Sequence, residues 1–280
     1  MEIAEYKELM TVTKMLREKK IPYTLERVNT SFSIKSKAYQ DSFQRRSIPP
    51  IELGFIKRIK NYVKKNNIDL NFEPVFTRDV RYVNYNLDNL GKGMYSENII
   101  EIDLDQAYWE MAYQLGVISD EIYEYGSKEN GKISKKGRLI ALGSLAKKKT
   151  IIHFDGENTK IEHEQEASMR NVFLNICKAV GDVINSLREK LGSNYYFHWV
   201  DAVFIENTPS AIKIVEETFR SHGFHFKTLP LNYVKVENKT IYAEETKTGK
   251  KKQYKLPTHK ELVSYYDLYR VSNLLEEMKI

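Results

Sequence analysis

The 280-residue chain is poor in cysteine, and it has no long apolar run. Its one cysteine, Cys177, excludes an intrachain disulfide framework and a cysteine-based zinc site. No apolar run approaches the ~18 residues that a membrane-spanning helix needs, so we expect no membrane partner. The N-terminus also lacks a basic segment followed by an apolar one, which argues against a secretory signal and favours a cytoplasmic location.

Two further absences narrow the class of protein. No internal repeat is visible at any period of ~20–50 residues, which argues against a solenoid or a propeller. His153 and His163 flank an Asp-Gly turn, but no third ligand clusters with them in the sequence, so a zinc site is not expected there.

Positive charge and aromatic side chains are what the chain has in plenty. Its formal net charge is +6, its pI is about 9.0, and it contains 19 tyrosines and 12 phenylalanines. A basic chain suits a polyanionic partner such as nucleic acid, although a merely basic protein is the plain alternative. The aromatic side chains can stack on bases, but we expect most of them to form the core.

Residues 1–90 form an N-terminal segment for which the sequence predicts mostly helix. Apolar side chains at helical spacing predict helices over 3–20 and 51–65, and the residues at 23–36 alternate enough for a short hairpin. The second helix has a basic face opposite its apolar residues. That face is either simply solvated or in contact with phosphate.

Strands and helices are interspersed from residue 98 onward without steady βαβ alternation, which predicts an α+β fold with an antiparallel sheet. We expect strands at 98–104, 149–154, 195–205, 224–229, 233–237, 239–244 and 252–256. We expect helices at 134–147, 164–191, 209–222 and 258–278.

The first of two notable acidic positions closes an apolar run. Asp103 ends Ile-Ile-Glu-Ile-Asp, and strand alternation places Glu101, Asp103 and Asp105 on one face. A strand that ends where a helix begins can present its carboxylates and the Leu104 carbonyl to a metal ion. Mg²⁺ prefers one or two carboxylates with phosphate and water oxygens. Asp105 lies nearer the strand's end than Glu101, so we rank it higher as an auxiliary ligand.

The second acidic position, Asp201, lies in Tyr-Phe-His-Trp-Val-Asp-Ala-Val-Phe-Ile at 196–205, which we expect to be one continuous strand. A lone carboxylate inside an apolar strand is costly unless it is paired or binds a metal. Two such carboxylates in a basic protein predict a two-metal phosphoryl-transfer site. Asp103 and Asp201 are therefore the predicted catalytic and metal-binding pair.

The residues around both positions resemble the palm motifs of family B DNA polymerases. Asp103 followed by Tyr108 resembles the family's first palm motif, an Asp with a Ser-Leu-Tyr-Pro-like sequence after it; Trp109 stands at the proline. The resemblance implies that Tyr108 lies under the sugar and excludes a 2′-hydroxyl. Trp199-Val-Asp201-Ala-Val-Phe is similar to Asp-Thr-Asp-Ser-Val-Phe, with Asp201 at the second, metal-binding Asp and Trp199 in place of the first.

The stretch Arg138-Leu-Ile-Ala-Leu-Gly-Ser-Leu-Ala-Lys147 resembles the family's fingers helix, which reads Lys-x-x-x-Asn-Ser-x-Tyr-Gly. The resemblance places Arg138 at the triphosphate-binding lysine, with Lys135 and Lys136 as rivals. We expect Lys147 to add a further phosphate contact, although the run Lys147–Lys149 could also be ordinary surface charge. The Asn and Tyr of the family are not retained. A cation at this place would neutralise charge as pyrophosphate leaves.

Lys239-Thr-Ile-Tyr242 resembles the Lys-x-Tyr segment that grips the primer end, with one extra residue between the two side chains. Lys252-Gln-Tyr254 fits that pattern literally, but it lies on the other strand of the expected hairpin. We prefer Lys239 and Tyr242 because of their position in the chain.

The resemblance covers about residues 90–255 and implies an antiparallel-sheet palm over 91–255 with short fingers at about 110–148. Residues 1–90 would be an accessory segment, and the helix within 256–280 a remnant of a thumb. The implied activity is transfer of dNTPs to a 3′ end on single-stranded or primer–template DNA. The implied cofactor is Mg²⁺, with Mn²⁺ as the alternative.

The N-terminal segment has no strand-borne Asp-x-Glu pair, so we expect no proofreading exonuclease. A minimal palm has little surface to hold a duplex, which implies a processivity or exonuclease partner protein and favours a phage or mobile-element source. Initiation without a primer, or extension without a template, stays open.

Two other interpretations compete with the polymerase. Trp199 and Trp109 stand where the family has an Asp and a Pro. The loss of these two residues favours a catalytically inactive palm that binds nucleic acid or a replication partner. The third interpretation is a basic α+β protein, such as a structural adaptor, whose motif matches are accidental. It predicts that Asp103 and Asp201 lie more than ~15 Å apart, too far to share two metal ions.

Overall fold

The computed structural model describes residues 3–28, 31–37, 40–43, 49–68, 85–86, 95–127, 131–237 and 240–255. It is an α+β structure with two antiparallel sheets, which confirms the fold class predicted from the sequence. The chain divides into two compact units. Unit 1 is Met1–Asn71 with Gly116–Leu174, and unit 2 is Phe72–Leu115 with Asn175–Ile280. Within the described ranges, no helix is long and apolar enough to cross a membrane.

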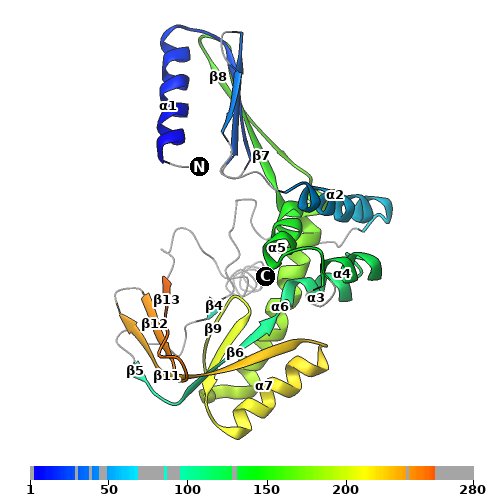
Figure 1. Ribbon diagram of the computed structural model, residues 1–280, viewed down its shortest axis with the longest axis vertical. Coiled ribbons are helices and arrows are strands. Elements are labelled where there is room, and N and C mark those ends of the chain that lie inside the picture. Colours follow the sequence, from blue (N-terminus) through cyan, green and yellow to red (C-terminus); the bar gives the residue numbers. More distant parts are fainter. Residues whose placement is uncertain are drawn as a thin grey trace, which may run out of the picture. The chain divides into compact units, whose positions relative to one another are not determined.

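Unit 1 combines most of the N-terminal segment with most of the stretch that we expected to form fingers, and it continues beyond that stretch to Leu174. Its elements are α1 (Ile3–Glu18), β1 (Tyr23–Val28), β2 (Ser31–Ser36), β3 (Gln40–Phe43), α2 (Pro50–Lys65), α4 (Asp120–Gly126), α5 (Lys135–Gly143), η1 (Ser144–Ala146), β7 (Lys148–Phe154) and β8 (Thr159–Gln165). The strands form an antiparallel sheet in the order β3-β2-β1-β7-β8. Helix α1 lies along this sheet (Figure 1), and Leu9 and Leu16 pack with Tyr23, Ile34 and Phe154 in a small core.

The second part of unit 1 is a tight pair of helices, α2 and α5. Helix α2 has Pro50 in its first turn and buries Phe55, Ile59 and Val63. The Ser134 hydroxyl caps α5 by accepting from the Gly137 N–H at 3.0 Å and donates to a Glu52 carboxylate oxygen of α2, also at 3.0 Å. A Cβ added at Gly137 would lie 2.7 Å from Ile133 Cγ2 and 2.9 Å from Glu52 Oε1. The close approach of Ile133 and of Glu52 on α2 therefore favours glycine at this position.

Unit 2 is built on the larger sheet. Its elements are β4 (Tyr85–Asn86), β5 (Tyr95–Ser96), β6 (Ile99–Asp105), α3 (Ala107–Gln114), most of α6 (Ala167–Leu191), η2 (Gly192–Asn194), β9 (Tyr195–Trp199), β10 (Ala202–Glu206), α7 (Pro209–Ser221), β11 (His225–Glu237), β12 (Thr240–Glu245) and β13 (Lys251–Lys255). The strand order is β13-β12-β11-β6-β10-β9-β4, with β5 also paired to β11.

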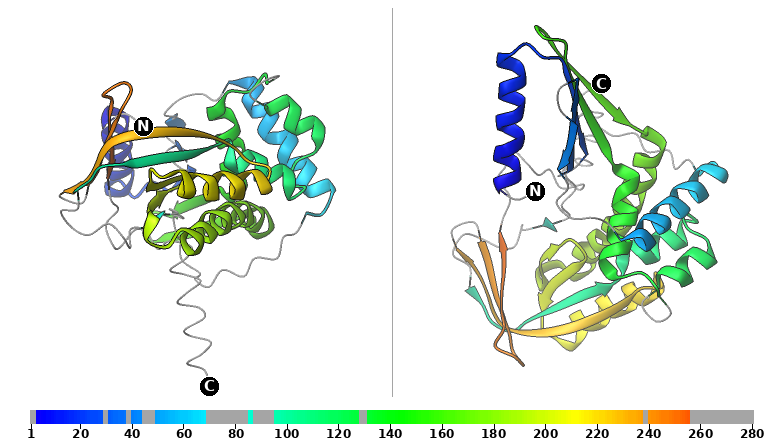
Figure 2. Two further views of the ribbon diagram at one scale, coloured as in Figure 1. Left: turned by 90° about the horizontal axis from the view of Figure 1, so that it is seen from below. Right: turned by 45° about the horizontal axis from the view of Figure 1, so that its top comes forward.

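The centre of unit 2 follows a β-α-β-β-α-β path through β6, α6, β9, β10, α7 and β11, with the strands side by side as β11-β6-β10-β9. This is the ferredoxin-like arrangement of an antiparallel sheet. Helices α6 and α7 lie on one side of β6 and β11 (Figure 1, Figure 2). The ring of Phe219 on α7 lies 5.9 Å from that of Phe226, which is paired with Leu104 of β6. The helices therefore cover the Leu104 face of the sheet.

The two faces of β6 differ as strand alternation predicts. Ile100, Ile102 and Leu104 share the face under the helices and are buried. Glu101, Asp103 and Asp105 alternate with them and so belong to the opposite face, as expected from the sequence. This side of the sheet is called the carboxylate face below. That face carries a second apolar cluster. Its members are Ile99, Phe197, Ala202, Phe204, Leu231, Val234, Ile241 and Ala243.

Two expected strands merge into one, one observed strand was not expected, and one expected helix is not described. The stretches 224–229 and 233–237 form one strand, β11, with an irregularity between Leu231 and Tyr233. Strand β8 was not predicted, because its side chains are mostly exposed and show no apolar alternation. The C-terminal helix at 258–278 lies outside the described residues.

Candidate active site

The two predicted catalytic residues lie on a strand and on an adjoining hairpin turn of unit 2. Strand β6 pairs antiparallel with β10, and Asp103 lies directly opposite Ala202. The Leu104 N–H donates to the main-chain carbonyl of Asp201 at 3.1 Å. Segments that are far apart in the sequence are therefore hydrogen bonded to each other where both acidic residues sit.

Asp201 does not lie in the middle of a strand, which corrects the expectation of one continuous strand over 195–205. Strands β9 and β10 form a hairpin in which Trp199 pairs with Ala202, and Val200 and Asp201 form its two-residue turn. Val200 has a φ of 59°. A β-branched residue rarely adopts a positive φ, and such strain often occurs at functional sites. The hairpin therefore holds Asp201 at its tip at a cost in backbone energy.

The segment after β6 turns sharply into helix α3. Gln106 has a φ of 62°, and α3 begins at Ala107. Trp109 is 2% exposed and contributes to the core. The turn is thus made by a left-handed residue at 106, and the tryptophan anchors the helix.

Tyr108 lies in the first turn of α3, close to the hairpin tip. Burial raises the pKa of Tyr108 well above its ordinary value, and the nearby Cys177 thiol and the Asp201 carboxylate raise it further. The phenol therefore stays protonated and can donate a hydrogen bond at neutral pH. The structure brings this predicted sugar-contacting residue into the surroundings of Asp201.

A lysine that the sequence did not reveal lies beside the carboxylate face. Lys227 of β11 lies directly opposite Asp103 in the strand register. Its ammonium is 3.5 Å from Asp105 Oδ1, and its side chain is 61% exposed. Asp105, the predicted auxiliary ligand, is therefore ion-paired within the sheet. Only the pairing of β6 with β11 shows this, because the two residues are far apart in the sequence.

Further along the same face, Glu101 forms a buried ion pair with β13. It is 6% exposed, and its two carboxylate oxygens accept from the Lys252 ammonium at 3.1 and 2.9 Å. Lys252 also lies 3.5 Å from Glu245 Oε1. Burial raises the pKa of Glu101, Lys252 lowers it, and the charges of Asp103 and Glu245 raise it. Glu101 is thus held by a lysine and is not presented to solvent.

The two versions of the Lys-x-Tyr pattern lie differently in the structure. Lys239 lies outside the described residues. Tyr242 alternates along β12 with the buried Ile241 and Ala243, so it faces away from the cluster that those two side chains join. Of the preferred pair, the structure describes only Tyr242, and Tyr242 does not lie on the carboxylate face.

The alternative version, Lys252 and Tyr254, does lie on the carboxylate face. Burial raises the pKa of Tyr254, and the nearby charges of Glu101, Asp103 and Glu245 raise it further. The Tyr254 ring lies 5.4 Å from the ring of Trp199, which pairs with Ala202 at the hairpin. Tyr254 and Trp199 therefore flank the carboxylates on this face.

The predicted triphosphate-binding cations belong to unit 1. Arg138 is 5% exposed, and its Nη1 donates to the carbonyl oxygens of Gly126 at 2.6 Å and Ile133 at 3.4 Å. This arginine fastens the end of α4 and the start of α5. Lys136 and Lys147 are exposed. Of the three, the lysines and not the arginine present their charge at the surface.

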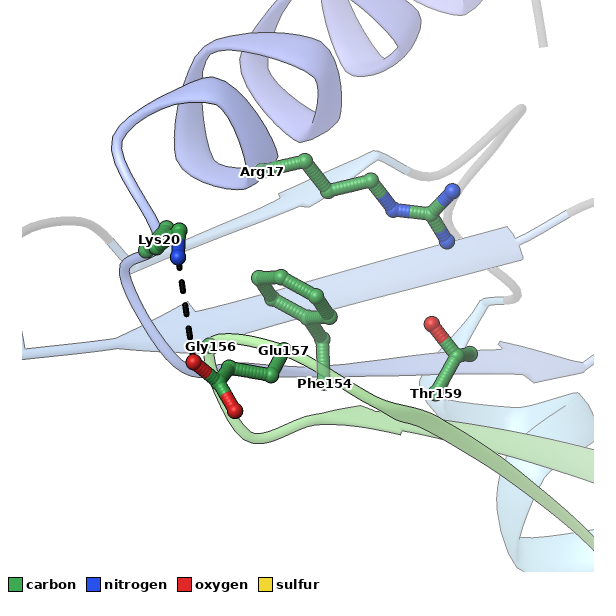
Figure 3. Close-up of a pocket in the computed structure, with 6 residues that line it drawn as sticks. All are labelled: Arg17, Lys20, Phe154, Gly156, Glu157 and Thr159. Carbon is green, nitrogen blue, oxygen red and sulfur yellow. Dashed lines mark ion pairs between the residues drawn. The ribbon is translucent and has the colours of Figure 1, made fainter.

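A surface hollow of roughly 480 Å³ lies elsewhere in unit 1, between the end of α1 and the β7–β8 turn (Figure 3). Its two cations already have partners. Arg17 Nε donates to the Tyr23 hydroxyl at 2.8 Å, and the Lys20 ammonium lies 3.7 Å from a Glu157 carboxylate oxygen. None of the residues predicted from the sequence to be functional lines it.

The donor set of the candidate site consists of hard oxygen atoms: the carboxylates of Asp103 and Asp201 and the carbonyl of Leu104. No group of three or more His, Cys, Asp or Glu side chains that could hold a metal ion occurs in the described part of the chain. Mg²⁺ usually keeps several waters and takes substrate phosphates beside one or two carboxylates. The set therefore fits a magnesium ion completed by a nucleotide and water, and it does not fit a metal cage made of protein alone.

Comparison with known proteins gives no family to which the chain can be assigned. No protein-family model, no curated protein and no solved structure matches it. The functional interpretation therefore depends on the residues and their geometry.

Proposed function

We propose that the chain is a nucleotidyltransferase that adds deoxynucleotides from dNTPs to a DNA 3′ end, without proofreading. The observation that carries the proposal is the pairing of β6 with β10, which brings Asp103 of β6 next to the β9–β10 turn that contains Asp201. The arrangement differs from an accidental motif match, because that interpretation predicts two distant carboxylates. The net charge of +6 adds support, since it favours a polyanionic substrate.

The residues around the hairpin tip have distinct roles in this proposal. Asp103, Asp201 and the Leu104 carbonyl would hold divalent ions, Mg²⁺ or Mn²⁺. The chemistry that such ions supply is activation of the 3′-hydroxyl and stabilisation of the leaving pyrophosphate. Tyr108 would lie under the sugar and exclude a 2′-hydroxyl by steric hindrance, with its phenol protonated. The sharp turns at Gln106 and Val200 would fix both carboxylates before substrate binds, and such pre-organisation lowers the barrier.

Primer extension tests the proposal. A labelled primer, on a template and alone, is incubated with dNTPs and either Mg²⁺ or Mn²⁺. Asp103→Asn and Asp201→Asn are each expected to slow extension at least about 100-fold, because metal binding supplies several kcal/mol of transition-state stabilisation. Extension by Asp201→Asn at the wild-type rate would overturn the proposed role of this site.

Asp182→Asn is the matched control. Asp182 is a half-exposed residue of α6 that pairs with Lys178 at 2.6 Å within the same helix. The substitution removes the same charge from unit 2 without touching the carboxylate face. It is expected to extend the primer at the wild-type rate.

A second candidate function is nucleic-acid binding by a palm without catalysis. Trp199 at the place of the family's first Asp favours it, and so does the burial of Arg138 against main-chain carbonyls. Isothermal titration with Mg²⁺, with and without a dNTP, separates the two candidates. Metal binding that is lost in Asp103→Asn supports the transferase, whereas oligonucleotide binding with no metal binding supports the inactive palm.

A further inference from the structure

Helix α2 of unit 1 carries a stripe of lysines. Lys57, Lys60 and Lys64 occupy positions i, i+3 and i+7, which lie on one side of a helix. The apolar residues Phe55, Ile59 and Val63 take the other side and are buried. Lys60 lies at the border between the two sides and is half-buried.

A lysine from a distant part of the sequence joins this stripe. Lys147 follows η1, directly after α5, and α5 packs against α2 through Ser134 and Glu52. Burial lowers the pKa of Lys60; the charge of Lys147 lowers it further, Glu166 raises it and Lys64 lowers it. The ammonium groups of Lys60, Lys64 and Lys147, the lysine cluster, therefore act on one another.

Acidic groups compensate the lysine cluster only in part. Glu166 Oε1 lies 3.0 Å from the Lys64 ammonium, and both side chains are about half exposed. Within the ranges that the structure describes, neither Lys60 nor Lys147 forms an ion pair with a carboxylate. Like charges that gather without enough partners oppose folding, and an anionic ligand would relieve that cost.

We propose that the lysine cluster is a phosphate-binding site that holds the backbone of a nucleic-acid strand. The site lies in unit 1, and its binding does not depend on the activity proposed for unit 2. Because a helix rises ~1.5 Å per residue, the cluster together with the neighbouring Lys57 extends for ~10 Å along α2, which suits a strand better than a single phosphate. Lysines act as point charges without the bidentate geometry of arginine, so the binding should not depend on base sequence.

Nucleic-acid binding by the full chain tests the proposal. Anisotropy of a labelled single-stranded oligonucleotide is measured without divalent ions over a range of salt concentrations. Lys60→Met and Lys147→Met keep the apolar stem and remove one charge each. Each is expected to weaken binding and to reduce the slope of log K against log salt by about 0.7, the value for one lost phosphate contact.

Lys14→Met is the matched control. Lys14 is a 77% exposed lysine of α1 that lies 3.7 Å from Glu18 Oε1. Its substitution changes the net charge of unit 1 by the same amount as the two test variants. An unchanged slope in Lys14→Met, with reduced slopes in the other two, supports the proposal. The same slope in all three variants overturns it and assigns the lysine cluster to ordinary solvated charge.

Stability supplies an independent readout. Lys60→Met is expected to raise the thermal midpoint, because it removes a half-buried charge that its lysine neighbours disfavour. Higher stability together with weaker binding is the pattern of a ligand site and not of a structural lysine. A lower midpoint with unchanged binding would overturn the proposal.

Inorganic triphosphate and a dNTP serve as competitors, because free phosphate groups share the chemistry of the backbone. Displacement of the oligonucleotide only at high competitor concentration supports backbone binding. Tight triphosphate binding that depends on Lys60, together with oligonucleotide binding that does not, overturns it in favour of a triphosphate site. Primer extension by the Asp201→Asn variant is a separate measurement, so failure of the transferase leaves this result interpretable.

Discussion

The carboxylate face of unit 2 and the lysine cluster of unit 1 gather charges of opposite sign and stabilise them differently. On the carboxylate face, acidic residues of β6 are paired inside the sheet: Glu101 with Lys252, and Asp105 with Lys227. In the lysine cluster, two of three ammonium groups have no carboxylate partner among the described residues. Removing Lys252 should therefore destabilise unit 2, whereas removing Lys60 should stabilise unit 1.

Lys252→Met is the strongest way to test this contrast. It would leave Glu101 buried without its partner, and breaking such a pair from one side costs about 3–5 kcal/mol. The free energy of unfolding, from urea titration followed by tryptophan fluorescence, measures the loss. Lys235→Met is the control, because Lys235 pairs with Glu237 at 2.9 Å at the surface of the same sheet, where pairs contribute less than about 1 kcal/mol.

The stability loss in Lys252→Met should also depend on pH. The pKa of Glu101 is already raised by burial, and losing Lys252 removes the strongest influence that lowers it. A raised pKa in the folded state favours protonated Glu101, so stability is highest below the ordinary pKa and falls as pH rises through the raised one. The loss in Lys252→Met should thus be larger near pH 8 than near pH 5, about one unit above the ordinary pKa of glutamate. Adding Glu101→Gln should remove that difference, and an equal loss at both pH values would contradict the buried-charge explanation.

His198 gives unit 2 a second dependence on pH, of opposite sign. It is 1% exposed, its Nδ1 is hydrogen bonded to the Tyr195 hydroxyl, and burial with the charge of Arg188 lowers its pKa to about 3. The neutral ring therefore stabilises the fold above pH ~6.5, and this contribution is lost as pH falls from there towards 3.

Acid titration of wild type and His198→Gln measures that loss. The wild type should lose about 1.4 kcal/mol more than the variant for each pH unit below ~6. Tryptophan fluorescence follows unit 2 alone, since both tryptophans, Trp109 and Trp199, belong to it. Parallel acid slopes in the two proteins would show that His198 becomes protonated without unfolding, and the contrast between the units would then weaken.

Much of the carboxylate face could be predicted from the sequence. The apolar run before Asp103 and the helix after it place that residue near a strand end, and alternation assigns Glu101 and Asp105 to the same face. These are local signals, and the structure agrees with them. The partners of these acids could not be predicted, because Lys227 and Lys252 reach them only through strand pairing, which depends on the whole sheet.

The hairpin tip shows a different limit. Two-residue hairpin turns usually carry glycine or asparagine where φ is positive, but this one has Val200, so the sequence looks like an uninterrupted strand. Tertiary structure overrides the local preference of that residue. Arg138 shows the converse, since a charged residue in a helix looks like a surface cation but is buried against the carbonyls of Gly126 and Ile133.

The smallest expected effect tests whether the two units are independent. Gly137→Ala would place a methyl group 2.7 Å from Ile133 Cγ2 between α2 and α5. Overpacking of this kind costs about 1–3 kcal/mol, and the helix preference of alanine returns about 1 kcal/mol. We expect a net loss of about 1 kcal/mol in unit 1. Circular dichroism follows both units, whereas tryptophan fluorescence follows unit 2.

Gly143→Ala is the matched control in the same helix. No atom lies within 4 Å of a Cβ built there, and its φ is −60°. The added methyl group should stabilise unit 1 by about 0.5–1 kcal/mol, because alanine loses less backbone entropy than glycine. If the units unfold separately, both substitutions move only the dichroism transition. A fluorescence midpoint that shifts equally in Gly137→Ala would mean that the units unfold together. The contrast between Lys252 and Lys60 would then have to be tested by oligonucleotide binding and primer extension, because a stability change could not be assigned to one unit.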